Sequence, residues 1–236
     1  MNWKQYGAAL FDLDGVLTPT AEVHMRAWDR MFNDYLVDHP DQPPYTDDDY
    51  FAHVDGKPRY DGVAAFLASR GIDLPHGSPD DAPAAETVCG LGNRKNDAFN
   101  RVLAEEGVSP YPGSLHLLED LEAAGTPMAV VSSSRNAPAV LEAAGIAHFF
   151  PVVMYGTLAE QRGLPGKPAP DTFQAAAADL GVAADACVVL EDAVSGVQAG
   201  AAGGFALVVG VDRGAGREVL QGAGAEVVVA DLEELR

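Results

Sequence analysis

The 236-residue sequence contains only two cysteines, Cys89 and Cys187, which are far apart and lack the spacing of a metal site. Two such thiols exclude a disulfide-stabilised scaffold and favour reduced core residues in a cytoplasmic protein. No apolar run approaches 18 residues, and no basic segment followed by an apolar stretch opens the sequence. We therefore expect neither a signal peptide nor a membrane span, and no membrane partner.

Basic residues are also scarce, with 15 Lys and Arg against 35 Asp and Glu, a formal net charge of −20 at pH 7. Such a charge repels nucleic acid, so we expect no nucleic-acid partner. An anionic substrate would need a locally basic site, which makes the few lysines informative. They are Lys4, Lys57, Lys95 and Lys167. The acidity is typical of a solvated surface, and a salt-tolerant source is the alternative.

The length suits one large domain, or a domain with an insert, that buries roughly 70–75% of its unfolded surface. Short apolar runs predict strands at residues 8–11, 128–131, 152–154, 187–190, 205–209 and 227–229. Helical patterns separate the later runs, at residues 114–124, 136–144, 171–180 and 194–202. Strands that alternate with helices predict a parallel sheet covered on both faces.

A purely helical pattern lies between the first two of these strands. Apolar residues recur there at three- and four-residue spacing, which predicts amphipathic helices. The expected helices span residues 25–36, 59–70 and 93–106. The sequence thus predicts an α/β, Rossmann-like core over residues 1–18 and 109–236, with an inserted all-helical cap domain over residues 19–108.

Two aspartates, Asp12 and Asp14, follow the first apolar run. Residues two apart on a strand point to the same side, so the two carboxylates converge. Two like charges about 4 Å apart repel by roughly 4 kcal/mol at an effective dielectric of about 20. The pair therefore indicates a metal site or an acid/base pair, with a solvated turn as the alternative.

Polar residues also follow other expected strands, where open α/β sheets bind their ligands. They are Ser132, Ser134, Arg135 and Asn136 after residues 128–131, and Glu191 and Asp192 after residues 187–190. In addition, Lys167 precedes the expected helix at residues 171–180. A nucleophilic carboxylate, a second carboxylate for proton transfer, metal ligands, a hydroxyl and an ammonium together suit phosphoryl transfer. Each residue alone is equally typical of a loop, a solvated side chain or a helix cap; their joint order favours the function.

These residues resemble the four motifs of the haloacid dehalogenase superfamily, and the resemblance covers essentially the whole chain. The motif residues are 12–17 (DLDGVL), Ser132, Lys167 and 191–192. Within the superfamily the chain is most similar to the β-phosphoglucomutase group. Residues 20–28 and 94–97 match two cap helices of that group, residues 134–136 match its segment after the second motif, and Arg59 matches a cap arginine.

The resemblance implies an aspartyl-phosphate mechanism with Asp12 as the nucleophile and Asp14 as the general acid/base. Ser132 and Lys167 would hold the transferring phosphoryl group. The implied cofactor is Mg²⁺, and its implied ligands are Asp12, the main-chain carbonyl of Asp14 and Asp192, with Glu191 nearby.

The resemblance also implies a second phosphate site, for a bisphosphate intermediate. Its expected residues are Arg59, Ser134, Arg135 and Asn136, and the arginine fork suits bidentate phosphate binding. His24 is implied in closure or in the geometry of Asp14, with a packed histidine as the alternative. Further expected substrate-binding residues are Thr20, Trp28, Lys57 and Lys95, of which Lys95 is equally compatible with solvation.

The expected partner is a small phosphosugar, and the expected enzyme is a monomer. One hypothesis is a mutase that converts β-D-glucose 1-phosphate into glucose 6-phosphate through the 1,6-bisphosphate. The other is a sugar-phosphate phosphatase, in which water accepts the phosphoryl group; the same residues serve both. Pro19 and Asp55 depart from the family pattern, which usually has an acidic residue and a lysine there. Retention of Asp12, Asp14 and Asp192 argues against a silent binding protein, and the presence of Asp14 argues against a dehalogenase.

Overall fold

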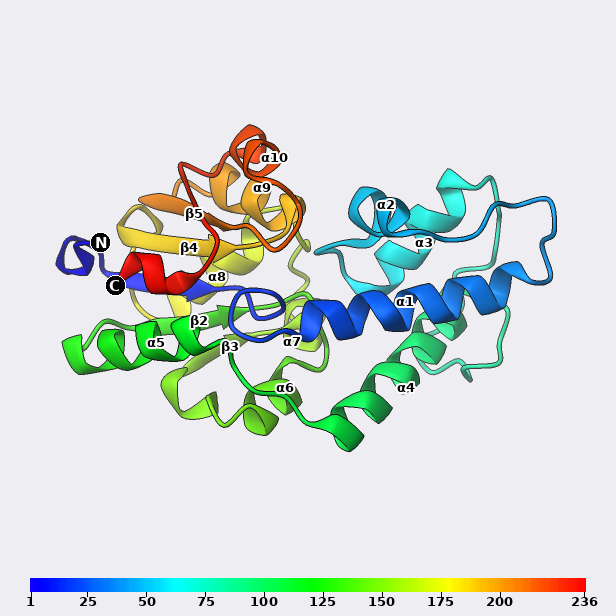
Figure 1. The fold of residues 1–236 in the computed structure, drawn as a ribbon, viewed down its shortest axis with the longest axis horizontal. Coiled ribbons are helices and arrows are strands. Elements are labelled where there is room, and N and C mark those ends of the chain that lie inside the picture. The colour runs from blue at the N-terminus through cyan, green and yellow to red at the C-terminus, as the bar shows by residue number, and fades with distance from the viewer. The chain divides into compact units, whose positions relative to one another are not determined.

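The computed structural model describes residues 1–236, the side chain of Glu106 excepted. The chain divides into two compact units, one of Met1–Thr20 with Val108–Arg236 and one of Ala21–Gly107 (Figure 1). Among the described residues, no helix is both long enough and apolar enough to cross a membrane.

The first unit is built on a six-stranded parallel sheet in the order β3-β2-β1-β4-β5-β6. The strands are β1 Ala8–Phe11, β2 Met128–Val131, β3 Val152–Met154, β4 Cys187–Glu191, β5 Leu207–Val211 and β6 Val227–Val229. This arrangement confirms the predicted Rossmann-like α/β sheet.

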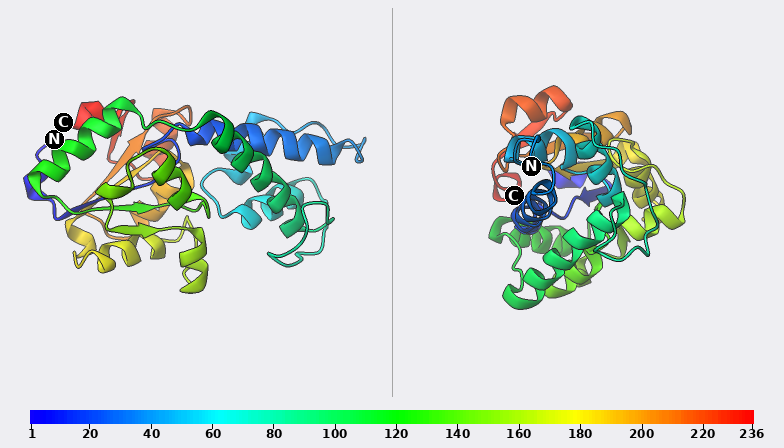
Figure 2. Two further views of the ribbon diagram at one scale, coloured as in Figure 1. Left: turned by 90° about the horizontal axis from the view of Figure 1, so that it is seen from below. Right: turned by 90° about the vertical axis from the view of Figure 1, so that its right-hand side faces the viewer.

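Helices cover both faces of the sheet (Figure 2). They are α5 Pro112–Ala124, α6 Ala137–Ala143, α7 Gly156–Gln161, α8 Asp171–Asp179, α9 Val194–Ala202 and α10 Arg217–Ala223. Every residue of β1, β2 and β4 is buried. Burial on both faces explains why these strands are continuous apolar runs in the sequence instead of alternating patterns.

The unit Ala21–Gly107 is helical. It contains most of α1 Thr20–Leu36, then α2 Asp47–Asp49, a π-helical turn Tyr50–Val54, α3 Arg59–Ser69 and α4 Val88–Glu106. Aromatic side chains pack against one another in its core. The ring centroid of Phe32 lies 4.1 Å from that of Phe66 and 4.9 Å from that of Tyr45.

Some helix and strand bounds differ from the prediction. α4 begins at Val88 and not near residue 93, because the Thr87 hydroxyl accepts a hydrogen bond from the amide of Gly90 (2.9 Å) and caps the helix there. β5 begins and ends two residues later than predicted. α7 and α10 were missed, because helices of six and seven residues are too short for a clear period.

The buried hydroxyl of Tyr45 generates a prediction about stability. Tyr45 is buried, and its hydroxyl has no hydrogen-bond partner among the described residues. Because an unsatisfied buried hydroxyl costs about 1–3 kcal/mol, Tyr45→Phe should raise the free energy of unfolding by about 1 kcal/mol. Urea denaturation measures this change.

The matched control is Tyr35→Phe, since the buried Tyr35 hydroxyl lies 3.3 Å from Nε2 of His39. Removal of that hydrogen bond should lower the free energy of unfolding by about 0.5–1.5 kcal/mol. Equal losses in the two variants would contradict the prediction.

Candidate functional site

The carboxyl ends of three strands meet at one edge of the sheet. Phe11, the last residue of β1, is level with the penultimate residues of β2 and β4. The amide of Asp12 donates to the carbonyl of Leu190 (2.9 Å), which extends the pairing one residue beyond β1. Ser132 directly follows β2, and Glu191 ends β4. The register therefore brings Asp12, Ser132 and Glu191 to the same edge.

Lys167 lies between two of these carboxylates. Its Nζ is 2.5 Å from Oδ1 of Asp12, 2.5 Å from Oε1 of Glu191 and 2.9 Å from the carbonyl oxygen of Val131. All three donors of the ammonium group are thus used. Lys167 is 4% exposed, Asp12 7% and Glu191 0%, so these charges are withdrawn from water. Burial of an ion costs several kcal/mol, which only such pairing offsets.

The pKa values of these groups follow from burial and charge. Burial raises the pKa of the Asp12 carboxyl well above its ordinary value; Lys167 opposes the rise, and the charges of Glu191 and Asp14 add to it. Burial lowers the pKa of Lys167, but the Asp12 and Glu191 carboxylates outweigh it and hold that pKa above its usual range. The ammonium group therefore stays charged, and the surplus of carboxyl groups favours a second cation.

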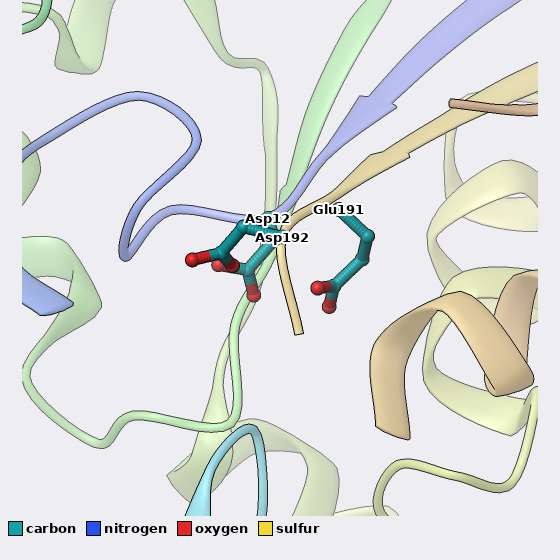
Figure 3. A group of neighbouring side chains, drawn as sticks. All are labelled: Asp12, Glu191 and Asp192. Atoms are coloured by element: carbon teal, nitrogen blue, oxygen red, sulfur yellow. The ribbon is translucent and has the colours of Figure 1, made fainter. Parts of the chain in front are cut away.

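Three carboxylates at this edge have the chemistry of a magnesium site. One oxygen each of Asp12, Glu191 and Asp192 lies within 4.8 Å of the others. Figure 3 shows the Asp12 and Asp192 carboxylates next to each other and Glu191 to one side. Gly15 has φ +88°, and a Cβ there would run into the Asp192 carboxylate, so a glycine is needed at this close approach. Carboxylate and carbonyl oxygens are ligands that Mg²⁺ prefers.

Asp14 has surroundings different from those of Asp12. Its Oδ1 accepts a hydrogen bond from the hydroxyl of Thr20, which is itself 2.8 Å from the hydroxyl of Thr18. Its Oδ2 lies 3.4 Å from Oγ of Ser132. Asp12 thus pairs with the Lys167 ammonium, and Asp14 is contacted by two hydroxyl groups. The sequence predicted Thr20 as a substrate-binding residue, whereas here its hydroxyl binds Asp14.

The segment after Ser132 is shaped by its own serines. Oγ of Ser132 accepts from the amide of Ser134 (3.0 Å), and Oγ of Ser134 accepts from the amide of Asn136 (3.1 Å). Nη2 of Arg135 lies 2.5 Å from Oε2 of Glu160, in α7. The sequence pattern gave no sign of Glu160, because α7 itself was not recognised.

His24, Trp28 and Lys95 lie together in the unit Ala21–Gly107. Nδ1 of His24 is hydrogen-bonded to Nζ of Lys95, and the His24 ring stacks on Phe99 with centroids 4.0 Å apart. The Lys95 ammonium also lies 4.8 Å from the Trp28 ring centroid. Lys95 is only 3% exposed, so the alternative of a solvated lysine is wrong for this residue.

Arg59 and Lys57 belong to the same unit, where Arg59 contacts two asparagine side chains and Lys57 a main-chain carbonyl. Nη2 of Arg59 donates to Oδ1 of Asn96 (2.7 Å), and Nη1 lies 3.4 Å from Oδ1 of Asn93. Nζ of Lys57 donates to the carbonyl oxygen of His53 (2.8 Å). The arginine is thus oriented by amide oxygens of α4, and Asn93 was not singled out from the sequence.

Comparison with known proteins gives a consistent picture. The family model described as haloacid dehalogenase-like hydrolase matches residues 6–204. The chain is 50% identical to the β-phosphoglucomutase of Mycobacterium bovis, over 97% of this chain and 90% of that protein. It is 34% identical to the β-phosphoglucomutase of Bacillus subtilis, over 97% and 91%. The crystal structure of β-phosphoglucomutase from Clostridium difficile has the same fold, with TM-score 0.80, 24% identity, and coverage of 98% and 93%.

The buried Lys167 generates a prediction about stability. Lys167→Met leaves Asp12 and Glu191 buried without their ammonium, so the free energy of unfolding should fall by about 3–5 kcal/mol. Adding Glu191→Gln to this variant should restore part of the loss. Lys57→Met is the matched control, because the Lys57 ammonium donates to the main-chain carbonyl of His53 and, among the described residues, pairs with no carboxylate. Chemical denaturation that gave equal losses for the two lysines would contradict the prediction.

Proposed function

The chain belongs to the haloacid dehalogenase-like hydrolase family, and on this premise we propose that it interconverts β-D-glucose 1-phosphate and glucose 6-phosphate through the 1,6-bisphosphate. The likeness to two β-phosphoglucomutases over nearly the whole chain carries the choice of substrate. The buried group of Asp12, Lys167 and Glu191 supports the reaction type, because it suits a carboxylate nucleophile held beside a fixed positive charge.

In this proposal Asp12 attacks phosphorus. A bond forms between a carboxylate oxygen and phosphorus, the bond from phosphorus to the sugar oxygen breaks, and an aspartyl phosphate results. Lys167 neutralises charge on the transferring group, together with the hydroxyl of Ser132. Lys167 is already buried and oriented, so little reorganisation is needed when charge moves onto the phosphoryl oxygens.

Asp14 acts as the general acid/base. It gives a proton to the sugar oxygen that leaves when the aspartyl phosphate forms. When the aspartyl phosphate passes its phosphoryl group to a sugar hydroxyl, Asp14 removes the proton of that hydroxyl. The hydroxyls of Thr20 and Ser132 support this role, because they contact the two carboxylate oxygens of Asp14 and orient the group. Thr20 is therefore better assigned to positioning Asp14 than to binding the sugar.

The acidic cluster fits Mg²⁺. Asp12, the main-chain carbonyl of Asp14 and Asp192 would hold the ion, with Glu191 nearby and committed to Lys167. When bound, Mg²⁺ supplies charge neutralisation at the phosphoryl oxygens.

A mutase needs a site for the phosphate that is not being transferred. We assign Ser134, Arg135 and Asn136 from the core to this task, with Arg59 from the helical unit. Residues 19–108 would form a cap that excludes water from the aspartyl phosphate. His24, Trp28, Lys57 and Lys95 are proposed as cap residues of the sugar site, in a monomeric cytoplasmic enzyme.

Turnover of β-D-glucose 1-phosphate tests the proposal directly. With Mg²⁺ and a trace of glucose 1,6-bisphosphate, the protein should form glucose 6-phosphate, detected by coupled dehydrogenase assay. Asp12→Asn should lower kcat by at least about 10³-fold because the nucleophile is lost, with the fold retained by circular dichroism. Asp185→Asn, on the exposed turn before β4, is the control and should keep full activity. Release of free phosphate without glucose 6-phosphate would instead favour the phosphatase.

Metal binding makes a separate prediction. Mg²⁺ at a hundred times its Kd should stabilise the wild-type protein by about 2.7 kcal/mol, seen as a rise in Tm. Asp192→Asn should lose most of that rise, whereas Asp185→Asn should keep it. Chelation with EDTA should abolish turnover reversibly. An equal rise in Tm for Asp192→Asn and wild type would refute the assignment of Asp192 as a ligand.

A further inference from the structure

Three consecutive main-chain carbonyls in the loop after Asp14 each accept a hydrogen bond from outside the loop. The pairs are Nε of Arg213 to Gly15 (2.9 Å), Oγ of Ser114 to Val16 (2.7 Å) and the amide of Tyr111 to Leu17 (2.9 Å). All six residues belong to the unit Met1–Thr20 with Val108–Arg236. The loop is therefore held from two other parts of the same unit, the start of α5 and the segment after β5.

Arg213 is itself fixed by several contacts. Its Cζ lies 3.8 Å from the ring centroid of Tyr111, and its Nη1 donates to the carbonyl oxygen of Ala230 (2.9 Å). Its Nη2 lies 3.5 Å from Oδ2 of Asp231. The planar guanidinium group thus contacts three different acceptors and also lies over a ring. A lysine cannot reproduce this set of contacts.

The turn that carries Arg213 is also ordered by a side chain. Oδ1 of Asp212 accepts hydrogen bonds from the amides of Gly214 (3.1 Å) and Gly216 (3.0 Å), both of which have positive φ. A side-chain carboxylate that caps its own turn in this way presents the next residue in one orientation. The hydrogen bonds within the turn therefore orient Arg213 toward the carbonyl of Gly15.

The loop of residues 15–17 lies next to the carboxyl groups of Asp14 and Asp192. Its amide of Gly15 donates to the carbonyl oxygen of Thr18 (2.8 Å), which closes a turn on which Asp14 sits. Gly15 also packs against the Asp192 carboxylate so closely that a Cβ would not fit. Gly15 follows Asp14 directly in this turn, so a displacement of Gly15 would move the Asp14 carboxyl group, and misplacement of a reacting group by about 1 Å costs about 10²-fold in rate.

We propose that Arg213 is a positioning residue that holds Asp14 in place for proton transfer, through its hydrogen bond to the Gly15 carbonyl. This inference rests on the proposed function, since it assumes that Asp14 serves the sugar oxygen. Arg213 contacts main-chain carbonyls, a tyrosine ring and Asp231, and its role is exerted through the loop.

Two phosphoryl donors with different leaving groups distinguish a loss of Asp14 positioning from a general loss of activity. When a sugar phosphate reacts, the bond from phosphorus to the sugar oxygen breaks and that oxygen takes a proton from Asp14. When acetyl phosphate phosphorylates Asp12, the bond from phosphorus to the acetate oxygen breaks and acetate leaves as a stable anion without a proton. Loss of positioning at Asp14 should therefore slow the first reaction and spare the second.

The experiment compares Arg213→Met with Arg217→Met in the 236-residue protein with Mg²⁺. Arg217 is exposed and donates to the carbonyl oxygen of Val228 (2.6 Å), so its replacement removes a similar hydrogen bond away from the loop. For Arg213→Met, kcat with β-D-glucose 1-phosphate should fall about 10–100-fold with KM changed less than about threefold. Formation of the aspartyl phosphate from acetyl phosphate, measured by intact mass, should stay near the wild-type rate, and Arg217→Met should keep both activities.

A double variant tests whether Arg213 acts through Asp14. In the Asp14→Asn background, Arg213→Met should cause no further loss in kcat, because the group it positions is already absent. Added guanidinium ion should restore part of the activity of Arg213→Met and none of that of Asp14→Asn. If Arg213→Met does not fold, Arg213→Lys replaces it, with a smaller expected loss in kcat and the same sparing of acetyl phosphate.

The opposite results overturn the inference. They are an unchanged kcat, an equal loss with acetyl phosphate and with sugar phosphate, or fully multiplicative losses in the double variant. Failure of the proposed function is seen separately, in wild-type protein that forms no glucose 6-phosphate. If the wild type instead releases phosphate, the same ratios are measured on phosphate release, where the sugar oxygen still needs a proton.

Discussion

The ammonium of Lys167, shared between the carboxylates of Asp12 and Glu191, is the interaction on which the site depends. The three charges come from the end of β1, the end of β4 and the segment before α8, and all are withdrawn from water. None would be tolerated there alone, because burial of an unpaired ion costs several kcal/mol. Their mutual pairing therefore determines how the strand ends and the Lys167 segment fit together.

The two aspartates that follow β1 show how one loop creates two kinds of carboxyl group. Asp12 faces the ammonium and two further carboxylates, whereas Asp14 faces the hydroxyls of Thr20 and Ser132. A nucleophile benefits from a charged, pre-oriented site, and a proton carrier benefits from hydrogen bonds that hold it within reach of the oxygen it serves. The external hydrogen bonds to the loop carbonyls, including that of Arg213, preserve this difference by keeping Asp14 and Gly15 in place.

The strands and the motif residues at their ends could be predicted because the information is local. A short apolar run followed by Asp12 is readable within ten residues, and parallel strands bring their carboxyl ends to one edge. Glu160 and Arg213 could not be found in this way. Their partners, Arg135 and Gly15, are 25 and 198 residues away in the sequence, and no local period marks the contacts.

The sequence by itself therefore determined the α/β class and the candidates Asp12, Asp14, Ser132, Lys167 and Asp192. The class follows from periodicity, four of the candidates follow a strand, and Lys167 precedes a helix. Only the tertiary structure decided how these groups divide their partners: that Lys167 binds Asp12 together with Glu191, that Thr20 binds Asp14, and that Arg213 holds Gly15. The physical reason is that a hydrogen bond or a close ion pair joins atoms about 3 Å apart in space, and separation along the chain does not show which atoms come that close.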